Sequence, residues 1–193
     1  ELNQRANQLA HYLRQQGVQP DTIVALCMER SIEMVVGILG VIKAGGAYLP
    51  IDPHSPAERR HFLLDDAQAD LVLTQDKLRL SFAGRTDEIV CLDSEWYKLL
   101  DQSQENLQHQ VRGHHAAYVI YTSGSTGLPK GVIVSHAAID NRLRWMQAAY
   151  PLGPDDRVLQ KTPSGFDVSV WEFFWPMQVG ATLVVVGPDE HRD

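Results

Sequence analysis

Residues 122–131 hold the side chains of this sequence that are best suited to chemistry on a phosphate group. The segment reads TSGSTGLPKG and contains three glycines, four hydroxyls and one lysine within ten residues. Glycines let a backbone approach a ligand without Cβ clashes, and a curled backbone directs successive N–H groups into one concavity that binds phosphate oxygens. We therefore predict a phosphate-binding loop made by Thr122, Ser123, Gly124, Ser125, Thr126, Gly127, Lys130 and Gly131.

Two other loop types fit these residues less well. A Walker A loop needs the pattern Gly-x-x-x-x-Gly-Lys-Ser/Thr, but Gly124 and Gly127 are too close together and Pro129 precedes the lysine. A flexible glycine–serine linker is the other alternative. Such a linker rarely follows an apolar strand and ends in Pro-Lys-Gly, as residues 117–131 do.

The second candidate for a functional residue is Asp167, which lies at the start of a predicted helix. Asp is well suited to the N-cap position, and from the sequence alone a helix cap is favoured over a binding role. Trp171 follows four residues later and shares a helix face with Asp167. Packing of Trp171 in the core with Phe174 and Trp175 is its alternative role, and the two roles are compatible.

Helical and strand patterns alternate along the chain. The sequence predicts helices over residues 1–16, 31–44, 55–67, 136–150 and 167–175, and strands over 22–27, 47–51, 70–74, 88–92, 116–122, 132–135, 157–160 and 181–186. This alternation predicts an α/β fold in which layered, mainly parallel sheets are flanked by helices.

Local signals refine these elements. Ser31 is expected to cap its helix, and Ser55 with Glu58 forms a predicted capping box around Pro56. Pro176 is expected to kink or end the helix that begins at Asp167. The strand over residues 181–186 is predicted to be buried.

A polar segment over residues 102–113 has few apolar anchors and is predicted to be a loop or linker. It suggests a possible division of the chain into residues 1–101 and 114–193. The pair His114 and His115 at its end lacks a third ligand at a plausible spacing. We therefore expect solvent-exposed histidines there and predict no metal site.

Composition excludes several classes of protein. The 193 residues are 44% hydrophobic and 21% charged, which excludes a disordered tail, a collagen-like repeat and a coiled coil. No apolar run is long enough to cross a membrane. The net charge of −7, without a Lys/Arg block, argues against a nucleic-acid partner. Cys27 and Cys91 lie in apolar runs without metal-ligand spacing, which predicts buried thiols in a reducing compartment.

Four segments resemble one protein family. Residues 122–131 look like the phosphate-loop signature of the adenylate-forming superfamily, which includes acyl-CoA synthetases, luciferases and the adenylation domains of non-ribosomal peptide synthetases. Residues 1–10, 39–53 and 166–174 resemble the first, second and fourth core motifs of the last group, in the family's order. The resemblance implies that residues 1–193 are the N-terminal part of an AMP-binding adenylation domain. The N-terminal subdomain of the adenylate-forming fold would then be incomplete in this chain.

The resemblance implies an enzyme that joins an amino acid to AMP, using ATP and releasing pyrophosphate. It then transfers the aminoacyl group to the phosphopantetheine thiol of a peptidyl carrier domain, beside a condensation domain. The loop would bind the departing pyrophosphate, with Thr126 and Lys130 as catalytic residues. Mg²⁺ is an implied cofactor whose ligand is expected outside residues 1–193.

The resemblance also assigns a substrate pocket to Phe166, Asp167, Val168 and Trp171. Asp167 would pair with the α-ammonium group of the amino acid. Residues 166–176 and 191–193 resemble the serine-activating domains of enterobactin-type synthetases, which implies L-serine as the substrate. The remaining pocket positions of the family lie beyond residue 193.

The chain begins inside a predicted helix and ends in a polar run after a strand, so we expect it to be part of a longer protein. The family's ribose-binding Asp and its C-terminal lysine are absent, so residues 1–193 alone are predicted to be inactive.

A non-catalytic relic or interaction module is one alternative. An acyl-CoA or aryl-acid ligase is another, against which Asp167 argues. The need for ATP and the lack of a signal peptide predict a cytoplasmic location.

Overall fold

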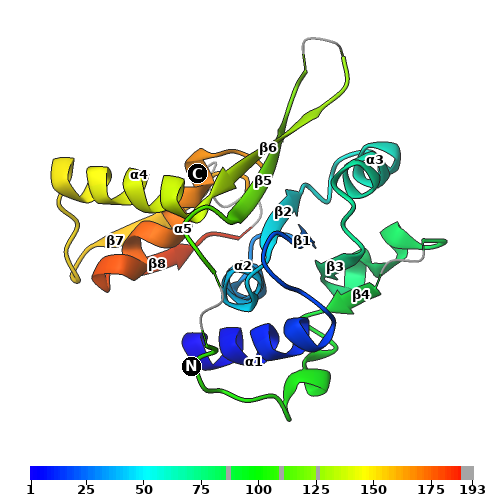
Figure 1. Ribbon diagram of the computed structural model, residues 1–193, viewed down its shortest axis with the longest axis horizontal. Coiled ribbons are helices and arrows are strands. Elements are labelled where there is room, and N and C mark those ends of the chain that lie inside the picture. The colour runs from blue at the N-terminus through cyan, green and yellow to red at the C-terminus, as the bar shows by residue number, and fades with distance from the viewer. Residues whose placement is uncertain (86–87, 109–110, 125–126, 188–193) are drawn as a thin grey trace.

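The computed structural model describes residues 1–85, 88–108, 111–124 and 127–187 (Figure 1). Helices and strands alternate along the chain, and two short segments are 3₁₀ helices (η). The elements are α1 (Leu2–Gln15), β1 (Ile23–Cys27), α2 (Ile32–Ala44), β2 (Ala47–Ile51), α3 (Ala57–Ala67), β3 (Leu71–Thr74), η1 (Asp76–Phe82), β4 (Glu88–Cys91), η2 (Trp96–Leu99), β5 (Ala116–Thr122), β6 (Lys130–Ser135), α4 (His136–Ala149), β7 (Arg157–Gln160), α5 (Val168–Val179) and β8 (Thr182–Val185).

The central sheet has six strands in the order β4-β3-β1-β2-β5-β6. The first five are parallel, and β6 runs antiparallel to β5, so that these two strands form a hairpin that projects from the body of the molecule (Figure 1). A second sheet contains the parallel pair β7-β8. The predicted α/β fold with mainly parallel sheets is therefore confirmed.

Strands β1, β2 and β3 of the central sheet are buried on both faces, whereas β6 is largely exposed. In β1, Val24 and Leu26 belong to the core cluster shared with α1 and α2, whereas Ala25 and Cys27 belong to the cluster shared with α3. This alternation follows from the two-residue period of a strand. Helices therefore cover both faces, as parallel sheets require.

Helices α1 and α2 pack closely because Gly40 has no side chain. A Cβ atom at this position would lie 2.5 Å from Cδ2 of Leu9. The start of α2 is also as predicted, since Ser31 Oγ accepts a hydrogen bond of 3.2 Å from the Met34 N–H. Among the described residues, Cys27 and Cys91 are free, buried thiols, as expected.

The predicted capping box at the start of α3 is wrong. The helix begins at Ala57 with Pro56 at the N-cap, and no side chain caps it. The buried Arg60 holds this turn, because its guanidinium donates to the carbonyls of Pro53 and Ser55. These Arg60 contacts are local in the sequence, and they fix the turn through its carbonyls without capping the helix N–H groups.

The expectation that Pro176 ends its helix is also wrong. Helix α5 continues through Pro176 to Val179 and ends at Gly180, which has a φ of +75°. A mid-helix proline costs about 3 kcal/mol, and burial of the neighbouring Trp175 against Leu143 and Met146 opposes that cost. Strand β8 is only partly buried, contrary to the prediction, because it belongs to a two-stranded sheet.

Residues 102–113 contain no helix or strand in their described part, and they pack against α1. Asn7 Nδ2 donates to the carbonyl of Gln104 at 2.6 Å, and Arg14 Nη2 donates to that of Gln108 at 3.0 Å. The strands on either side of this segment share one sheet, since β2 pairs with β5. The division of the chain at this segment stays a prediction.

The histidine pair shows one exposed and one half-buried member. His114 is exposed, and Nδ1 of His115 accepts a hydrogen bond of 3.0 Å from the Arg112 N–H. Within the described ranges, no group of three His, Cys, Asp or Glu side chains could hold a metal ion. No described helix is long and apolar enough to cross a membrane.

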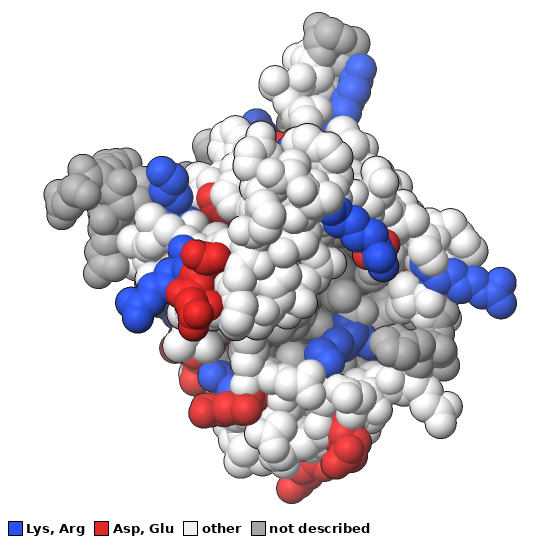
Figure 2. Space-filling model, turned by 90° about the vertical axis from the view of Figure 1, so that its left-hand side faces the viewer, with Lys and Arg blue, Asp and Glu red and all other residues white. Residues whose placement is uncertain are grey.

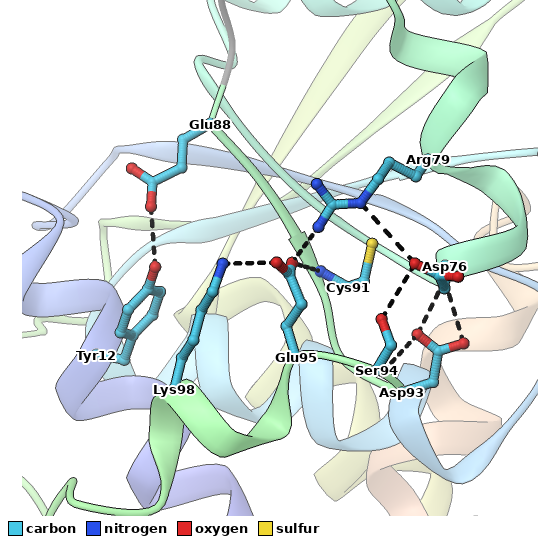
Figure 3. Close-up of polar contacts among 9 residues, drawn as sticks. All are labelled: Tyr12, Asp76, Arg79, Glu88, Cys91, Asp93, Ser94, Glu95 and Lys98. Carbon is cyan, nitrogen blue, oxygen red and sulfur yellow. Dashed lines mark hydrogen bonds and ion pairs between the residues drawn. The ribbon is translucent and has the colours of Figure 1, made fainter.

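Glu95 ties together the outer edge of the central sheet (Figure 3). Its carboxylate receives Arg79 Nη2 from η1 at 2.5 Å, Lys98 Nζ from η2 at 2.6 Å and the backbone N–H of Cys91 in β4 at 2.9 Å. Burial alone raises the pKa of this carboxyl, but the Cys91 N–H, the Lys98 ammonium and Arg79 outweigh burial and hold the pKa below its usual value.

Glu95→Gln should lower the free energy of unfolding by about 1–2 kcal/mol at pH 7, because a charge-assisted acceptor is lost. The Glu95 pKa is lower in the folded than in the unfolded protein. The contribution of Glu95 to the free energy of unfolding is therefore present above its pKa in the unfolded protein, which is about 4.3. It is lost as the pH falls through its lower pKa in the folded protein. Urea unfolding at pH 7 and at acidic pH should show the two proteins converging in acid. The exposed Glu58→Gln is the matched control, and a pH-independent difference would contradict this account.

Candidate functional site

The predicted phosphate loop lies at the tip of the β5–β6 hairpin (Figure 1). Thr122 ends β5 and pairs with Lys130, the first residue of β6. The Gly127 N–H donates to the carbonyl of Gly124 at 3.0 Å. Two of the predicted residues, Ser125 and Thr126, lie outside the described residues.

The glycines of this loop are required by its backbone. A Cβ atom at Gly124 would lie 2.1 Å from the Leu128 carbonyl oxygen, and Gly127 has a φ of +86°, which favours glycine. At Gly131, a Cβ atom would lie 3.1 Å from the ring of Tyr121. The backbone at Gly124 and Gly127 therefore favours glycine, and the phosphate-binding role of the loop stays a prediction.

Lys130 belongs to β6 and is exposed. Its side chain passes beside Gly124, where its Cγ and Cε atoms would lie 3.3 Å from an added Cβ. The opposite strand is anchored by Tyr121, whose hydroxyl donates to Asp66 of α3 at 2.6 Å. The hairpin therefore holds the lysine beside the loop glycines, and exposed Thr122 and Ser123 complete the described part of the loop.

The second part of the site is a cavity of about 400 Å³ between α4, α5 and the β5–β6 hairpin. Asp167, Val168 and Trp171 line it, so three of the four predicted substrate residues come together. Phe166 is 63% exposed and is not among the lining residues. Trp171 also packs edge-on against Trp175, with ring centroids 6.0 Å apart, so its two proposed roles are compatible.

The carboxylate of Asp167 is exposed and does not cap α5. Asp167 occupies the N-cap position, but its side chain makes no capping hydrogen bond. No hydrogen bond or ion pair of this carboxylate is found within the described part of the chain. Its charge reaches Tyr118, whose pKa is raised first by burial and then by Asp167. The carboxylate is therefore available to a ligand in the cavity.

Among the cavity residues that the sequence did not predict, two carry polar groups. Tyr118 of β5 and Arg142 of α4 both line the cavity, and the Arg142 guanidinium lies 4.7 Å from the ring centroid of Trp145. Tyr118 carried a usable signal, because it lies on the strand that leads into the loop. Arg142 carried none, since an arginine on a half-polar helix usually faces water.

Strand β5 connects the two parts of the site. Tyr118 lines the cavity and Thr122 begins the loop, four residues further along. At about 3.3 Å per residue, the two positions are about 13 Å apart on the same face of the strand. This separation suits a ligand with one end in the cavity and an anionic end at the loop.

The surface charge does not by itself attract an anion. Figure 2 shows basic and acidic side chains interspersed on the face that it presents, without one large patch of either sign. With a net charge of −7, an anionic ligand needs local donors. In the described part of the loop, the exposed Thr122, Ser123 and Lys130 are such donors.

Comparison with known proteins identifies the family of this chain. The AMP-binding enzyme family matches residues 1–193. The chain is 50% identical to zwittermicin A synthase ZmaJ of Bacillus cereus over 97% of its length, and 44% identical to enterobactin synthase component F of Escherichia coli O157:H7 over all of it. It spans 35% and 15% of the lengths of these relatives, respectively.

A solved structure shares the fold. The non-ribosomal peptide synthetase FmoA3, in a form bound to alpha-methyl-L-serine-AMP, superposes with a TM-score of 0.90 at 36% identity. The match covers 97% of this chain and 21% of FmoA3. Because the family matches the full length of this chain, the chain belongs to the AMP-binding enzyme family, in the branch of the non-ribosomal peptide synthetase adenylation domains.

Proposed function

We propose that the protein containing this chain activates an amino acid as its aminoacyl adenylate for non-ribosomal peptide synthesis. An oxygen of the amino-acid carboxylate attacks the α-phosphorus of ATP. The new bond is the acyl–phosphate bond, and the bond to pyrophosphate breaks. One observation carries the proposal: strand β5 leads from a cavity lined by the Asp167 carboxylate to a glycine-rich loop.

In this proposal the loop binds the β- and γ-phosphates and stabilises the charge that develops on the departing pyrophosphate. The loop hydroxyls and Lys130 are the proposed donors, together with loop N–H groups other than that of Gly127, which donates to the Gly124 carbonyl. Preorganised donors of this kind contribute about 3–4 kcal/mol each to transition-state stabilisation. Mg²⁺ would neutralise phosphate charge, and we place its ligands outside residues 1–193.

Asp167 is proposed to pair with the α-ammonium group of the substrate, with Phe166, Val168 and Trp171 beside it. A carboxylic acid without the amine would leave the carboxylate without its partner, which disfavours binding. L-Serine is the proposed substrate. The relation to enterobactin synthase component F and the alpha-methyl-L-serine-AMP bound by FmoA3 support serine, although tyrocidine synthase 3 matches at a higher identity of 51%.

The activated amino acid is proposed to pass to the phosphopantetheine thiol of a peptidyl carrier domain, beside a condensation domain. The thiol sulfur attacks the acyl carbon, a thioester forms and AMP leaves. The protein is proposed to act in the cytoplasm, where ATP is supplied.

Asp167→Ala in the complete adenylation domain should lower serine-dependent ATP–pyrophosphate exchange about 100-fold or more, because the substrate ammonium loses its counter-charge. Asp155→Ala, which removes an exposed carboxylate elsewhere, should leave exchange unchanged. Wild-type exchange by Asp167→Ala would refute the role of this residue.

Thr126→Ala and Lys130→Ala should each lower kcat for adenylation by about 10²–10³, because each removes a donor to the leaving group. The KM for serine should change less than threefold, since the proposal assigns both side chains to the phosphates and neither to the amino acid. Thr182→Ala on β8 serves as the control for loss of an exposed hydroxyl. An unchanged kcat in both loop variants would overturn their catalytic assignment.

Residues 1–193 purified alone should show no serine-dependent ATP–pyrophosphate exchange, because the proposed ribose, Mg²⁺ and C-terminal lysine groups are not in this segment. The complete domain, assayed in parallel, supplies the positive control. Exchange by the short chain above a no-enzyme blank would show that these groups are dispensable.

A further inference from the structure

Helix α5 contains a buried carboxylate that the proposed mechanism does not use. Glu172 is 2% exposed in an otherwise apolar helix. Its Oε2 accepts hydrogen bonds from the backbone N–H groups of Lys161 at 3.1 Å and Thr162 at 3.0 Å, and its Oε1 accepts from the Thr162 hydroxyl at 2.5 Å. The Gln160 amide adds a longer contact of 3.4 Å. Glu172 thus holds the start of the turn over residues 161–167.

Ser169 holds the other end of the same turn. It is 1% exposed, and its Oγ lies 2.7 Å from the carbonyl oxygen of Phe166 and 3.3 Å from that of Ser164. Ser169 and Glu172 are three residues apart, so they share one face of the helix. Within the turn, the Phe166 N–H donates to the Pro163 carbonyl at 3.0 Å.

A third contact fixes the turn to the central sheet. Arg30, in the connection between β1 and α2, donates through Nη1 to the carbonyl of Lys161 at 2.6 Å. The peptide units around Lys161 are therefore held on the N–H side by Glu172 and on the C=O side by Arg30. The turn has a defined position relative to both sheets.

The opposite face of α5 lines the cavity. Asp167, Val168 and Trp171 contact the cavity, whereas Ser169 and Glu172 contact the turn. Burying a carboxylate without a cation is costly unless its lone pairs are filled. A methionine or leucine would suit an apolar helix better, so the carboxylate is best explained by the backbone that it arranges.

We propose that Glu172, assisted by Ser169, is a positioning residue for amino-acid recognition: it fixes the turn that presents Asp167 to the α-ammonium group of the substrate. This inference rests on the proposed function of Asp167. Glu172 itself does not line the cavity, and it acts through residues 161–167. It affects recognition of the amine, and it leaves the phosphate loop on the β5–β6 hairpin unchanged.

The test compares Glu172→Ala with Glu172→Gln in the complete adenylation domain. The Gln oxygen can accept from the Lys161 and Thr162 N–H groups while its NH₂ donates to the Thr162 hydroxyl, so Gln should preserve the turn. The readout is the ratio of kcat/KM for L-serine to that for 3-hydroxypropionate, which is serine without its amine. This ratio does not depend on the fraction of folded enzyme.

Glu172→Ala should raise the KM for serine at least tenfold and lower the serine preference about tenfold, with the KM for ATP changed less than twofold. Glu172→Gln should stay within threefold of wild type in all three quantities. Equal losses for both acids, or an unchanged preference in Glu172→Ala, would overturn the positioning role.

Ser169→Ala keeps the proposal testable if Glu172→Ala does not fold, because it removes only one hydroxyl. It should lower the serine preference three- to tenfold, and an unchanged preference would count against the proposal. Gln178→Ala, on the exposed end of α5, is the matched control and should match wild type.

A wild-type domain without preference for the amine would refute the function proposed for Asp167, and the positioning role with it. A wild-type preference that Glu172→Ala and Ser169→Ala both retain would refute the positioning role alone.

Discussion

The packing of Tyr48, Tyr118 and Phe174 connects the two halves of the candidate site. Tyr48 of β2 pairs with Tyr118 of β5, with ring centroids 5.6 Å apart, and Phe174 of α5 lies 6.4 Å from the Tyr48 ring. This contact joins β5, which leads to the loop, to α5, which carries Asp167. Aromatic groups of this size bury a large area and resist displacement. The spacing between loop and cavity therefore depends on the packing of these rings, one of which, Tyr118, also lines the cavity.

Three faces of the segment formed by Asp167 and helix α5 make three different contacts. Phe173 is buried against the central core, Asp167 faces the cavity, and Glu172 faces the turn before the helix. A helix with so little polar surface can still contain a carboxylate because backbone N–H groups fill its lone pairs. In this way the same short segment supplies stability, a recognition group and its orientation.

The sequence was sufficient to predict an element where one local feature determined its structure. Apolar runs predicted β1 and β5, and the Ser31 cap predicted the start of α2. The prediction failed at Ser55, whose carbonyl binds the nearby Arg60 while no side chain caps α3. It failed again at Pro176, where packing keeps the helix intact. The positioning role proposed for Glu172 was missed because its partners are backbone N–H groups and a hydroxyl before the helix. Arg142 was missed because its helix pattern does not mark it as a cavity residue. A single glutamate in an apolar helix is the signal that could have indicated Glu172.

The central claim is that one strand joins a site for an amino acid to a site for triphosphate. The most direct measurement is ATP–pyrophosphate exchange by the complete domain with a panel of amino acids and of carboxylic acids that lack an amine. The account predicts exchange with amino acids, highest with L-serine, and little with the amine-free acids. Exchange driven by amine-free acids, with none for any amino acid, would contradict it.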